Sequence, residues 1–202
     1  ALGSRLQAED LHAVGDTTFG TWNYSYDDAG NLIQTTNPND QIVQYVYDDI
    51  NRILSENYTG QSGTEVIYTY DNCTSGVGKV CNIISNGTSA SYQYNALGLV
   101  TSEIKTISGV AYNTQYTYDR QGNKVTLTNP DNSQIKYGYN TAGQLETIQR
   151  KENTDANFVN VVTDFDYGPH GVLTFQANHN GTAITNTFDA SKQYRLVRKQ
   201  TS

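Results

Sequence analysis

The four-residue string Tyr-x-Tyr-Asp recurs along this chain at nearly even spacing, and this repetition constrains the fold more than any other feature. Of the 16 tyrosines, 13 lie in copies of the string, and successive copies begin 21 to 28 residues apart. A period of this length is typical of arrays of similar structural units. Asn replaces Asp in two copies, and weaker copies follow at Phe165-Asp-Tyr167 and around Phe188-Asp189.

Each copy predicts a β-hairpin. Alternating large residues indicate a half-buried strand, and the Asp or Asn that follows is suited to bonding the backbone of a turn. A glycine two or three residues later supplies the positive φ that a tight hairpin turn needs. We expect the structural repeat residues to be Tyr24, Tyr26, Asp27, Gly30, Tyr45, Tyr47, Asp48, Tyr68, Tyr70, Asp71, Tyr92, Tyr94, Gly98, Tyr116, Tyr118, Asp119, Gly122, Tyr137, Tyr139 and Gly143.

The predicted fold class is all-β: an antiparallel β-hairpin repeat ribbon that curls into an open or partial spiral shell, a solenoid of hairpins. With 36% hydrophobic residues and a mean hydropathy of −0.61, the chain is too polar for a thick two-layer core. Open sheets of more than about ten strands usually curl, split or close. The alternative is an ordinary β-sandwich or barrel whose strands happen to be rich in tyrosine.

We expect two regions: a lead-in over residues 1–21 and an array of seven to eight hairpins over residues 22–202. Ser4 to Val14 is predicted to be a short helix or disordered. The chain contains no Met and begins Ala-Leu-Gly-Ser, which suggests a piece of something longer.

The repeat resembles that of the Rhs/YD-repeat family, whose unit reads Tyr-x-Tyr-Asp-x-x-Gly-(Arg or Asn)-Leu. The best copy is Tyr24-Ser-Tyr-Asp-Asp-Ala-Gly-Asn-Leu32, and a second runs from Tyr116 to Asn123. The chain departs from the pattern at Asn51, which stands where the family usually has Gly, and in four extra residues before Gly78.

The resemblance implies a hollow shell of hairpins, found in large secreted or surface proteins of bacteria and in animal teneurins. In toxin complexes and polymorphic toxins such a shell encloses a C-terminal toxic domain. The implied partners are therefore the remainder of a parent Rhs-type shell and an enclosed C-terminal toxin, and the implied location is secreted or cell surface. The family's self-cleaving Asp-Pro-x-Gly-Leu sequence is not found here, so that activity is not carried over.

Cys73 and Cys81 lie across the enlarged third turn. If the strands pair there, the two side chains face each other at a distance that a disulfide accepts. A disulfide favours an exported protein, whereas two reduced cysteines would suit a cytosolic one. Two ligands are too few for a structural zinc site.

No residue pattern indicates catalysis, and we expect neither an enzyme nor a cofactor. His12, His170 and His179 lack metal-binding spacing, and His170 reads as a turn residue. The repeated aspartates are explained by turns, with calcium as the weaker alternative. A net charge of −7 and a pI near 4.8 argue against a nucleic-acid partner, and no apolar run is long enough to span a membrane.

The predicted function is therefore structural: a non-catalytic segment of an encapsulating shell. The alternative is an adhesion module in which exposed tyrosines and Trp22 stack on a glycan or a surface partner. Edge-to-edge self-association is a further expectation, because unpaired strand edges attract other strands. If the tyrosines pack across strands, Ala at Tyr47 or Tyr94 should destabilise the fold more than Ala at Thr117.

Overall fold

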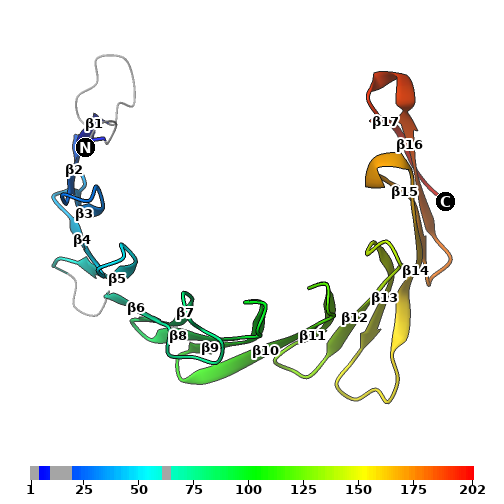
Figure 1. Ribbon diagram of the computed structural model, residues 1–202, viewed down its shortest axis with the longest axis horizontal. Coiled ribbons are helices and arrows are strands. Elements are labelled where there is room, and N and C mark those ends of the chain that lie inside the picture. The colour runs from blue at the N-terminus through cyan, green and yellow to red at the C-terminus, as the bar shows by residue number, and fades with distance from the viewer. Residues whose placement is uncertain (1–4, 10–19, 61–64) are drawn as a thin grey trace. The chain divides into compact units, whose positions relative to one another are not determined.

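The computed structural model describes residues 5–9, 20–60 and 65–202, and these are almost entirely β-strand (Figure 1). All 17 strands belong to one antiparallel sheet. Two 3-10 turns, η1 (Pro169–Gly171) and η2 (Ala190–Lys192), interrupt the strand pattern. The strands are β1 (Gln7–Glu9), β2 (Thr21–Tyr26), β3 (Leu32–Thr36), β4 (Ile42–Tyr47), β5 (Ile53–Tyr58), β6 (Val66–Tyr70), β7 (Val80–Ser85), β8 (Thr88–Tyr94), β9 (Val100–Ile107), β10 (Val110–Tyr118), β11 (Lys124–Thr128), β12 (Gln134–Tyr139), β13 (Leu145–Lys151), β14 (Val159–Tyr167), β15 (Leu173–Asn178), β16 (Ala183–Asp189) and β17 (Arg195–Thr201).

The prediction of an antiparallel hairpin repeat is confirmed. Each copy of the tyrosine string ends the first strand of a hairpin, and the strand after the turn runs back beside it. The two eroded copies near the C-terminal end form the same hairpin. Counting from β2, the eight hairpins are β2–β3, β4–β5, β6–β7, β8–β9, β10–β11, β12–β13, β14–β15 and β16–β17.

A β-bulge recurs one step before the turn in these hairpins. In the first hairpin Ser25 pairs with Gln34 but Tyr26 pairs with Leu32, so Ile33 has no opposite residue. The same register shift precedes the second tyrosine of the hairpins β4–β5, β6–β7, β10–β11, β12–β13 and β14–β15. A bulge increases the local twist of a strand pair and redirects its side chains.

The turns use the backbone geometry that the glycines suggest. Gly30 has φ 89°, and its N–H donates to the carbonyl of Asp27 at 3.0 Å. Asn51 takes the corresponding place with φ 63°, which explains how the second hairpin manages without glycine: Asn tolerates the left-handed region better than most residues.

The lead-in was expected to be a short helix or disordered, and the structure has a strand in the part that it describes. Gln7–Glu9 form strand β1, which pairs with β2 through Gln7 and Asn23. The side chain of Gln7 also donates to Asn23 Oδ1 at 3.1 Å, so this segment extends the sheet. Pairing with an adjacent strand outweighs a marginal helix of this length. Residues 4 and 10–14 of this segment lie outside the described residues.

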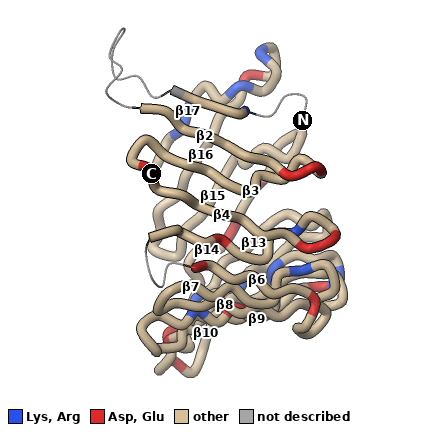
Figure 2. The backbone as a smooth tube through the Cα atoms, turned by 90° about the vertical axis from the view of Figure 1, so that its left-hand side faces the viewer, with Lys and Arg blue, Asp and Glu red and all other residues tan. Residues whose placement is uncertain are grey.

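The chain forms two compact units, each described by itself: an N-terminal unit of residues 1–98 and 103–112, and a C-terminal unit of residues 99–102 and 113–202. Within the described part of the chain, the only buried apolar residues are Cys81, Tyr94 and Val162. Asp and Glu lie mainly at turns and strand ends (Figure 2). Such low burial fits an array in which each repeat is stabilised mainly by its neighbours. Over the same residues, no helix has the length and apolar character needed to cross a membrane.

Candidate functional site

The second tyrosine of each string joins its hairpin to the preceding strand pair. Its hydroxyl donates to a backbone carbonyl of the preceding return strand, at 2.6 to 2.9 Å. The accepting residue is the one that pairs with the second tyrosine of the earlier hairpin, as Leu32 pairs with Tyr26. The tyrosine-to-carbonyl links are Tyr26 to Arg5, Tyr47 to Leu32, Tyr70 to Ile53, Tyr94 to Val80, Tyr118 to Val100, Tyr139 to Lys124 and Tyr167 to Leu145.

The last hairpin keeps this link with a different side chain. Phe188 occupies the position of the second tyrosine but has no hydroxyl. Instead, the Asn186 amide donates to the carbonyl of Leu173 at 3.1 Å. The bond to the preceding hairpin therefore persists where the sequence motif has eroded.

Burial raises the pKa of five tyrosines that form these links. Desolvation is the first cause of a raised pKa at Tyr47, Tyr70, Tyr94, Tyr118 and Tyr139. The neutral phenol is the form that donates to the carbonyl, so both effects favour the protonated state.

Alkaline pH should therefore unfold the array through these tyrosines. Because their folded pKa lies above the ordinary value of 10.0, their contribution to stability is complete below pH 10 and is lost as the pH rises above it. We expect the melting temperature to fall above pH 10, with tyrosinate absorbance rising together with the loss of β circular dichroism. Complete tyrosine titration near pH 10 with the fold intact would contradict this expectation.

The first tyrosines make more varied contacts. The hydroxyl of Tyr68 donates to Glu56 Oε1 at 2.8 Å, and that of Tyr58 donates to Glu56 Oε2 at 3.2 Å. Desolvation and the bond to Glu56 raise the pKa of Tyr68 to about 12. One carboxylate therefore joins the second hairpin to the third.

The string's acids bond the turn backbone. Asp27 Oδ1 accepts from the N–H of Asn31 at 2.7 Å, and Asp119 Oδ1 accepts from the N–H of Asn123 at 2.9 Å. Asn140 makes the same bond with Gln144 at 2.9 Å. Hydrogen bonds to the charged form lower the pKa of Asp27 and Asp119, led by the side chains of the Asn residues that follow.

Acid should destabilise the hairpins whose turns begin with Asp. A lowered folded pKa means that the contribution is complete above the ordinary value of 3.8 and is lost as the pH falls below it. We expect Asp119→Asn to keep the turn, as Asn140 does, and to make the melting temperature less sensitive to pH below 3.8. If this variant loses as much stability in acid as the unchanged chain, Asp119 is not a source of the acid sensitivity.

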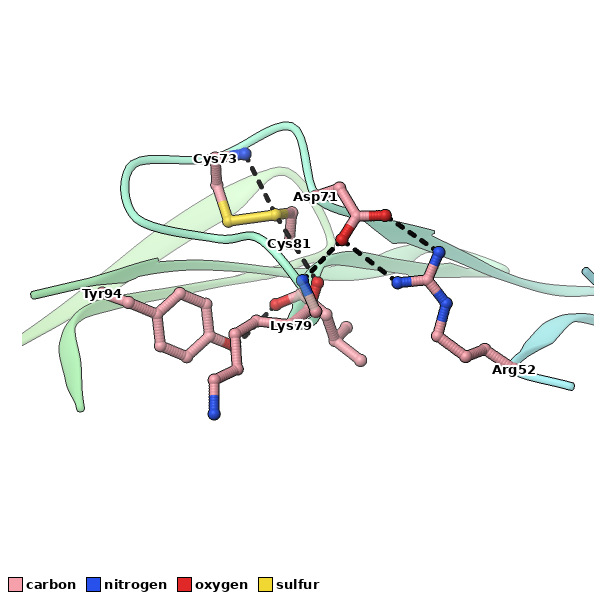
Figure 3. Close-up of a disulfide and its surroundings, with 8 residues drawn as sticks. Arg52, Asp71, Cys73, Lys79, Cys81 and Tyr94 are labelled. Atoms are coloured by element: carbon pink, nitrogen blue, oxygen red, sulfur yellow. Dashed lines mark hydrogen bonds and ion pairs between the residues drawn. A yellow bond between two sulfur atoms is a disulfide. The ribbon is translucent and has the colours of Figure 1, made fainter. Parts of the chain in front are cut away.

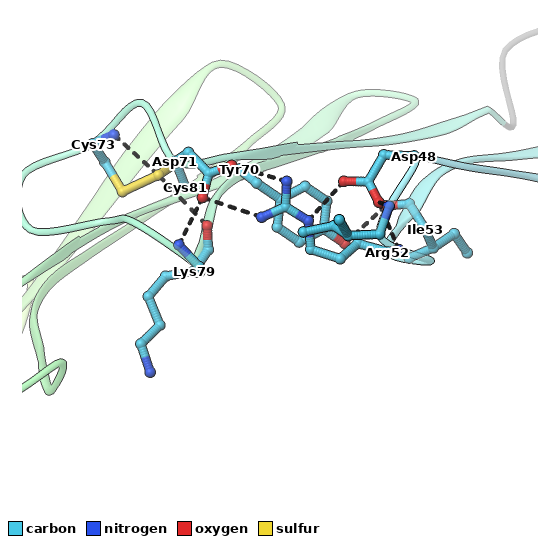
Figure 4. A network of polar contacts seen from close by, with 10 residues as sticks. Asp48, Arg52, Ile53, Tyr70, Asp71, Cys73, Lys79 and Cys81 are labelled. Carbon is cyan, nitrogen blue, oxygen red and sulfur yellow. Dashed lines mark hydrogen bonds and ion pairs between the residues drawn. A yellow bond between two sulfur atoms is a disulfide. The ribbon is translucent and has the colours of Figure 1, made fainter.

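An ion-pair network connects the second and third hairpins (Figure 4). The Arg52 guanidinium bonds Asp48 Oδ2 at 2.7 Å within its own turn and Asp71 Oδ2 at 2.8 Å in the next. It also lies 4.3 Å from the centre of the Tyr70 ring, a cation–π contact. The hydrogen bonds from Arg52 lower the pKa of Asp71. Arg52 therefore holds two successive turns in a fixed register.

The predicted disulfide between Cys73 and Cys81 is present, with the two Cα atoms 5.4 Å apart (Figure 3). Cys81 is completely buried, and its Sγ accepts from the N–H of Cys73 at 3.0 Å. The loop passes directly over the sulfur atoms at Gly76. A Cβ there would collide with Cys73 Sγ and lie 2.8 Å from Cys81 Sγ, so this position requires glycine.

This enlarged turn, residues 71–79, contacts three successive hairpins. Asp71 binds Arg52 of the preceding hairpin and accepts from the N–H of Gly78 at 2.7 Å. The carbonyl of Thr74 accepts from the N–H of Tyr94, which belongs to the next hairpin, at 3.1 Å. The four extra residues are thus folded back onto the sheet, and the disulfide holds them there.

Trp22 lies on β2 and lines a groove of about 230 Å³ in the N-terminal unit, together with Thr35, Val43 and Tyr58. Asn37 also lines the groove, but its amide is already bonded within its own turn. The glycan-stacking role suggested for Trp22 remains a prediction, and the comparisons below give it no support.

The sequence predicts the roles of the tyrosines, the turn acids and the cysteines, but not the links between hairpins. It indicates no partner for the tyrosine hydroxyls and no role for Arg52. One signal was available: Arg or Asn follows the turn residue in several repeats, where a long polar side chain can reach a neighbouring turn.

Comparison with solved structures supports the same fold. The TcdB2-TccC3 crystal structure matches with a TM-score of 0.79 at 16% identity, over 91% of this chain and 10% of that chain. The Tc holotoxin pore of Photorhabdus luminescens, with a TccC3 mutation, matches with a TM-score of 0.77 at 15% identity over the same shares. This chain spans about a tenth of the length of those chains.

A search of curated protein sequences gives no significant match. At the level of families, however, residues 9–158 match the teneurin YD-shell family. This match covers most of the hairpin array, including six copies of the tyrosine string. The chain therefore belongs to the teneurin YD-shell family.

Proposed function

We propose that this chain is a non-catalytic wall segment of an encapsulating YD-repeat shell, within a large secreted or surface protein of the toxin type. The observation that carries the proposal is the regular tyrosine-to-carbonyl link. It joins hairpin to hairpin in both units and is replaced by Asn186 where the tyrosine is lost. A wall requires the same contact between each hairpin and the next, and it requires no single cluster of functional side chains.

The physical properties of the ribbon suit that role. A shell wall must resist opening while remaining wet on its surfaces, and tyrosine combines a large apolar ring with a hydroxyl that can bond the backbone. Repeated links spread the stability over many equivalent contacts, so neighbouring hairpins support one another. The disulfide and the Arg52 network add local reinforcement at the third hairpin.

The partners in this proposal are the remainder of a parent shell and an enclosed C-terminal toxin. The similar structures are assemblies named TcdB2-TccC3 and the Tc holotoxin pore, which is consistent with a toxin context. A disulfide supports an oxidising location such as the cell exterior, because cytosolic thiols are kept reduced.

Electron cryomicroscopy of the full-length parent protein, combined with limited proteolysis, tests this function. We expect this segment to form part of a closed β wall, and a chain segment inside it to resist protease until the wall is opened by denaturant. An open array that encloses nothing, with every other segment cleaved at the rate of free chain, would contradict the proposal.

A further inference from the structure

Three successive hairpins of the N-terminal unit present an exposed apolar side chain at the same turn position. Ile50, Val77 and Leu97 each directly precede the turn residue with positive φ, and their exposures are 67%, 86% and 62%. Single exposed apolar residues need no explanation, but a repeated set on one edge indicates an interaction surface. We call Ile50, Val77 and Leu97 the turn-edge row.

The structure holds Val77 exposed on a constrained loop. The disulfide and the contact of Gly76 with both sulfur atoms fix the loop, and Thr74 fastens it to Tyr94. Val77 therefore has little freedom to turn back onto the sheet. A side chain fixed in its exposed position loses less conformational entropy on binding, which favours affinity.

The spacing of the turn-edge row selects the shape of a partner. Equivalent turns of successive hairpins are two strands apart, or about 10 Å. An α-helix places residues i and i+7 on one face about 10.5 Å apart. A β-strand places same-face residues at multiples of about 6.8 Å, which does not match.

The charges around the row select the chemistry of that partner. The turns of the first four hairpins carry five aspartates against two cations. Arg52 pairs with Asp48 and Asp71, and the Lys79 side chain lies against Gly98, next to Leu97. Acidic segments are visible at the turn ends of these strands in Figure 2. The five aspartates are Asp27, Asp28, Asp48, Asp49 and Asp71. The acidic excess therefore lies at the first two turns of this edge, where it repels a second acidic edge and attracts a cationic partner.

We propose that the turn-edge row is a docking surface for a basic amphipathic α-helix with apolar residues at every seventh position. The apolar side chains of the helix lie against Ile50, Val77 and Leu97, and its Lys or Arg residues face the exposed carboxylates of Asp28 and Asp49. The proposal concerns an outer contact of the hairpins, and it stands whether or not the chain forms part of a shell.

The test uses the full 202-residue chain and a labelled synthetic Leu/Lys helix with Leu at i and i+7, followed by fluorescence anisotropy. A peptide of the same composition in scrambled order and a Leu/Glu counterpart are the controls. We expect the triple variant Ile50→Ser, Val77→Ser, Leu97→Ser to bind the helix at least about tenfold more weakly. This corresponds to a loss of about 1.4 kcal/mol or more in binding free energy. Ile107→Ser, which removes an apolar side chain that is 51% exposed elsewhere in the unit, is expected to leave binding unchanged.

Two further measurements separate the contributions of the aspartate charges and of the disulfide to binding of the helix. Asp28→Asn with Asp49→Asn should weaken binding several-fold and reduce its dependence on salt, because these charges steer the partner. Cys73→Ser with Cys81→Ser should also weaken binding, provided that circular dichroism shows the sheet intact. Equal binding of the scrambled helix, or of the triple variant, overturns the proposal. Sedimentation showing a dimer that the triple variant abolishes also overturns it, because the occupant would then be a second copy.

Discussion

Replacing Tyr94 by Ala is expected to lower the free energy of unfolding by about 3–5 kcal/mol, the range for removing a buried aromatic ring. Tyr94 is 9% exposed and is the most buried tyrosine among the described residues. Its hydroxyl donates to the carbonyl of Val80 at 2.6 Å, so the substitution also leaves this acceptor without its partner. Chemical denaturation followed by circular dichroism measures the change.

Two controls separate the contribution of the Tyr94 ring to stability from that of its hydroxyl and from the general effect of substituting a strand residue. Tyr94→Phe keeps the ring and should cost only about 0.5–1.5 kcal/mol, the net value of one hydrogen bond. Thr117→Ala changes an exposed residue between two tyrosines and should cost clearly less than Tyr94→Ala. Similar losses for Tyr94→Ala and Thr117→Ala would show that the tyrosine face is not the packed face of the sheet.

Removing the disulfide with the double substitution Cys73→Ser and Cys81→Ser is expected to lower the free energy of unfolding by about 2.6 kcal/mol, from loop-closure entropy alone. The sequence separation of the cysteines is 8, so the closed loop is short. A further loss is expected because the disulfide holds Thr74 against the N–H of Tyr94. The melting temperature of the double variant, without reductant, measures the effect.

Gly76→Ala gives an independent test of the same loop. The added Cβ collides with both sulfur atoms, so this variant should be destabilised although both cysteines remain. Gly87→Ala in the next turn is a comparison without a collision: its Cβ meets no atom within 4 Å, and its φ of 73° gives the cost of backbone strain alone. Two reactive thiols in the untreated chain, or an unchanged melting temperature for the double serine variant, would contradict the assigned role of the disulfide.

Much of the hairpin array could be predicted from the sequence because its signals are local. Tyr26 and Asp27 end a strand and open a turn through contacts within a few residues, and Gly30 marks the positive φ directly. The cysteine pair could also be predicted, since two strands joined by a short turn bring Cys73 and Cys81 together. The strand at Gln7–Glu9 was not expected, because the pairing of Gln7 with Asn23 depends on a strand 16 residues away.

The contacts between hairpins could not be predicted from the sequence, because they are made between residues of different repeats. The partner of the Tyr47 hydroxyl is the backbone carbonyl of Leu32. Every residue has such a carbonyl, so the sequence does not identify which one accepts the bond. The replacement of this bond by Asn186 in the last hairpin was equally hidden, because Asn is common throughout the chain. The exposed position of Val77 depends on how the extra residues of the third turn fold back onto the sheet.

The sequence by itself determined that this protein is an array of antiparallel hairpins with tyrosine-rich strands and Asp or Asn turns, because strand alternation and turn chemistry act over a few residues. Only the tertiary structure decided which carbonyl each tyrosine binds, how Arg52 joins two turns, and which side chains line the exposed turn edge. Those features depend on the register between successive hairpins, in which Thr35 pairs with Val43 for example, and this pairing is made between strands of different repeats.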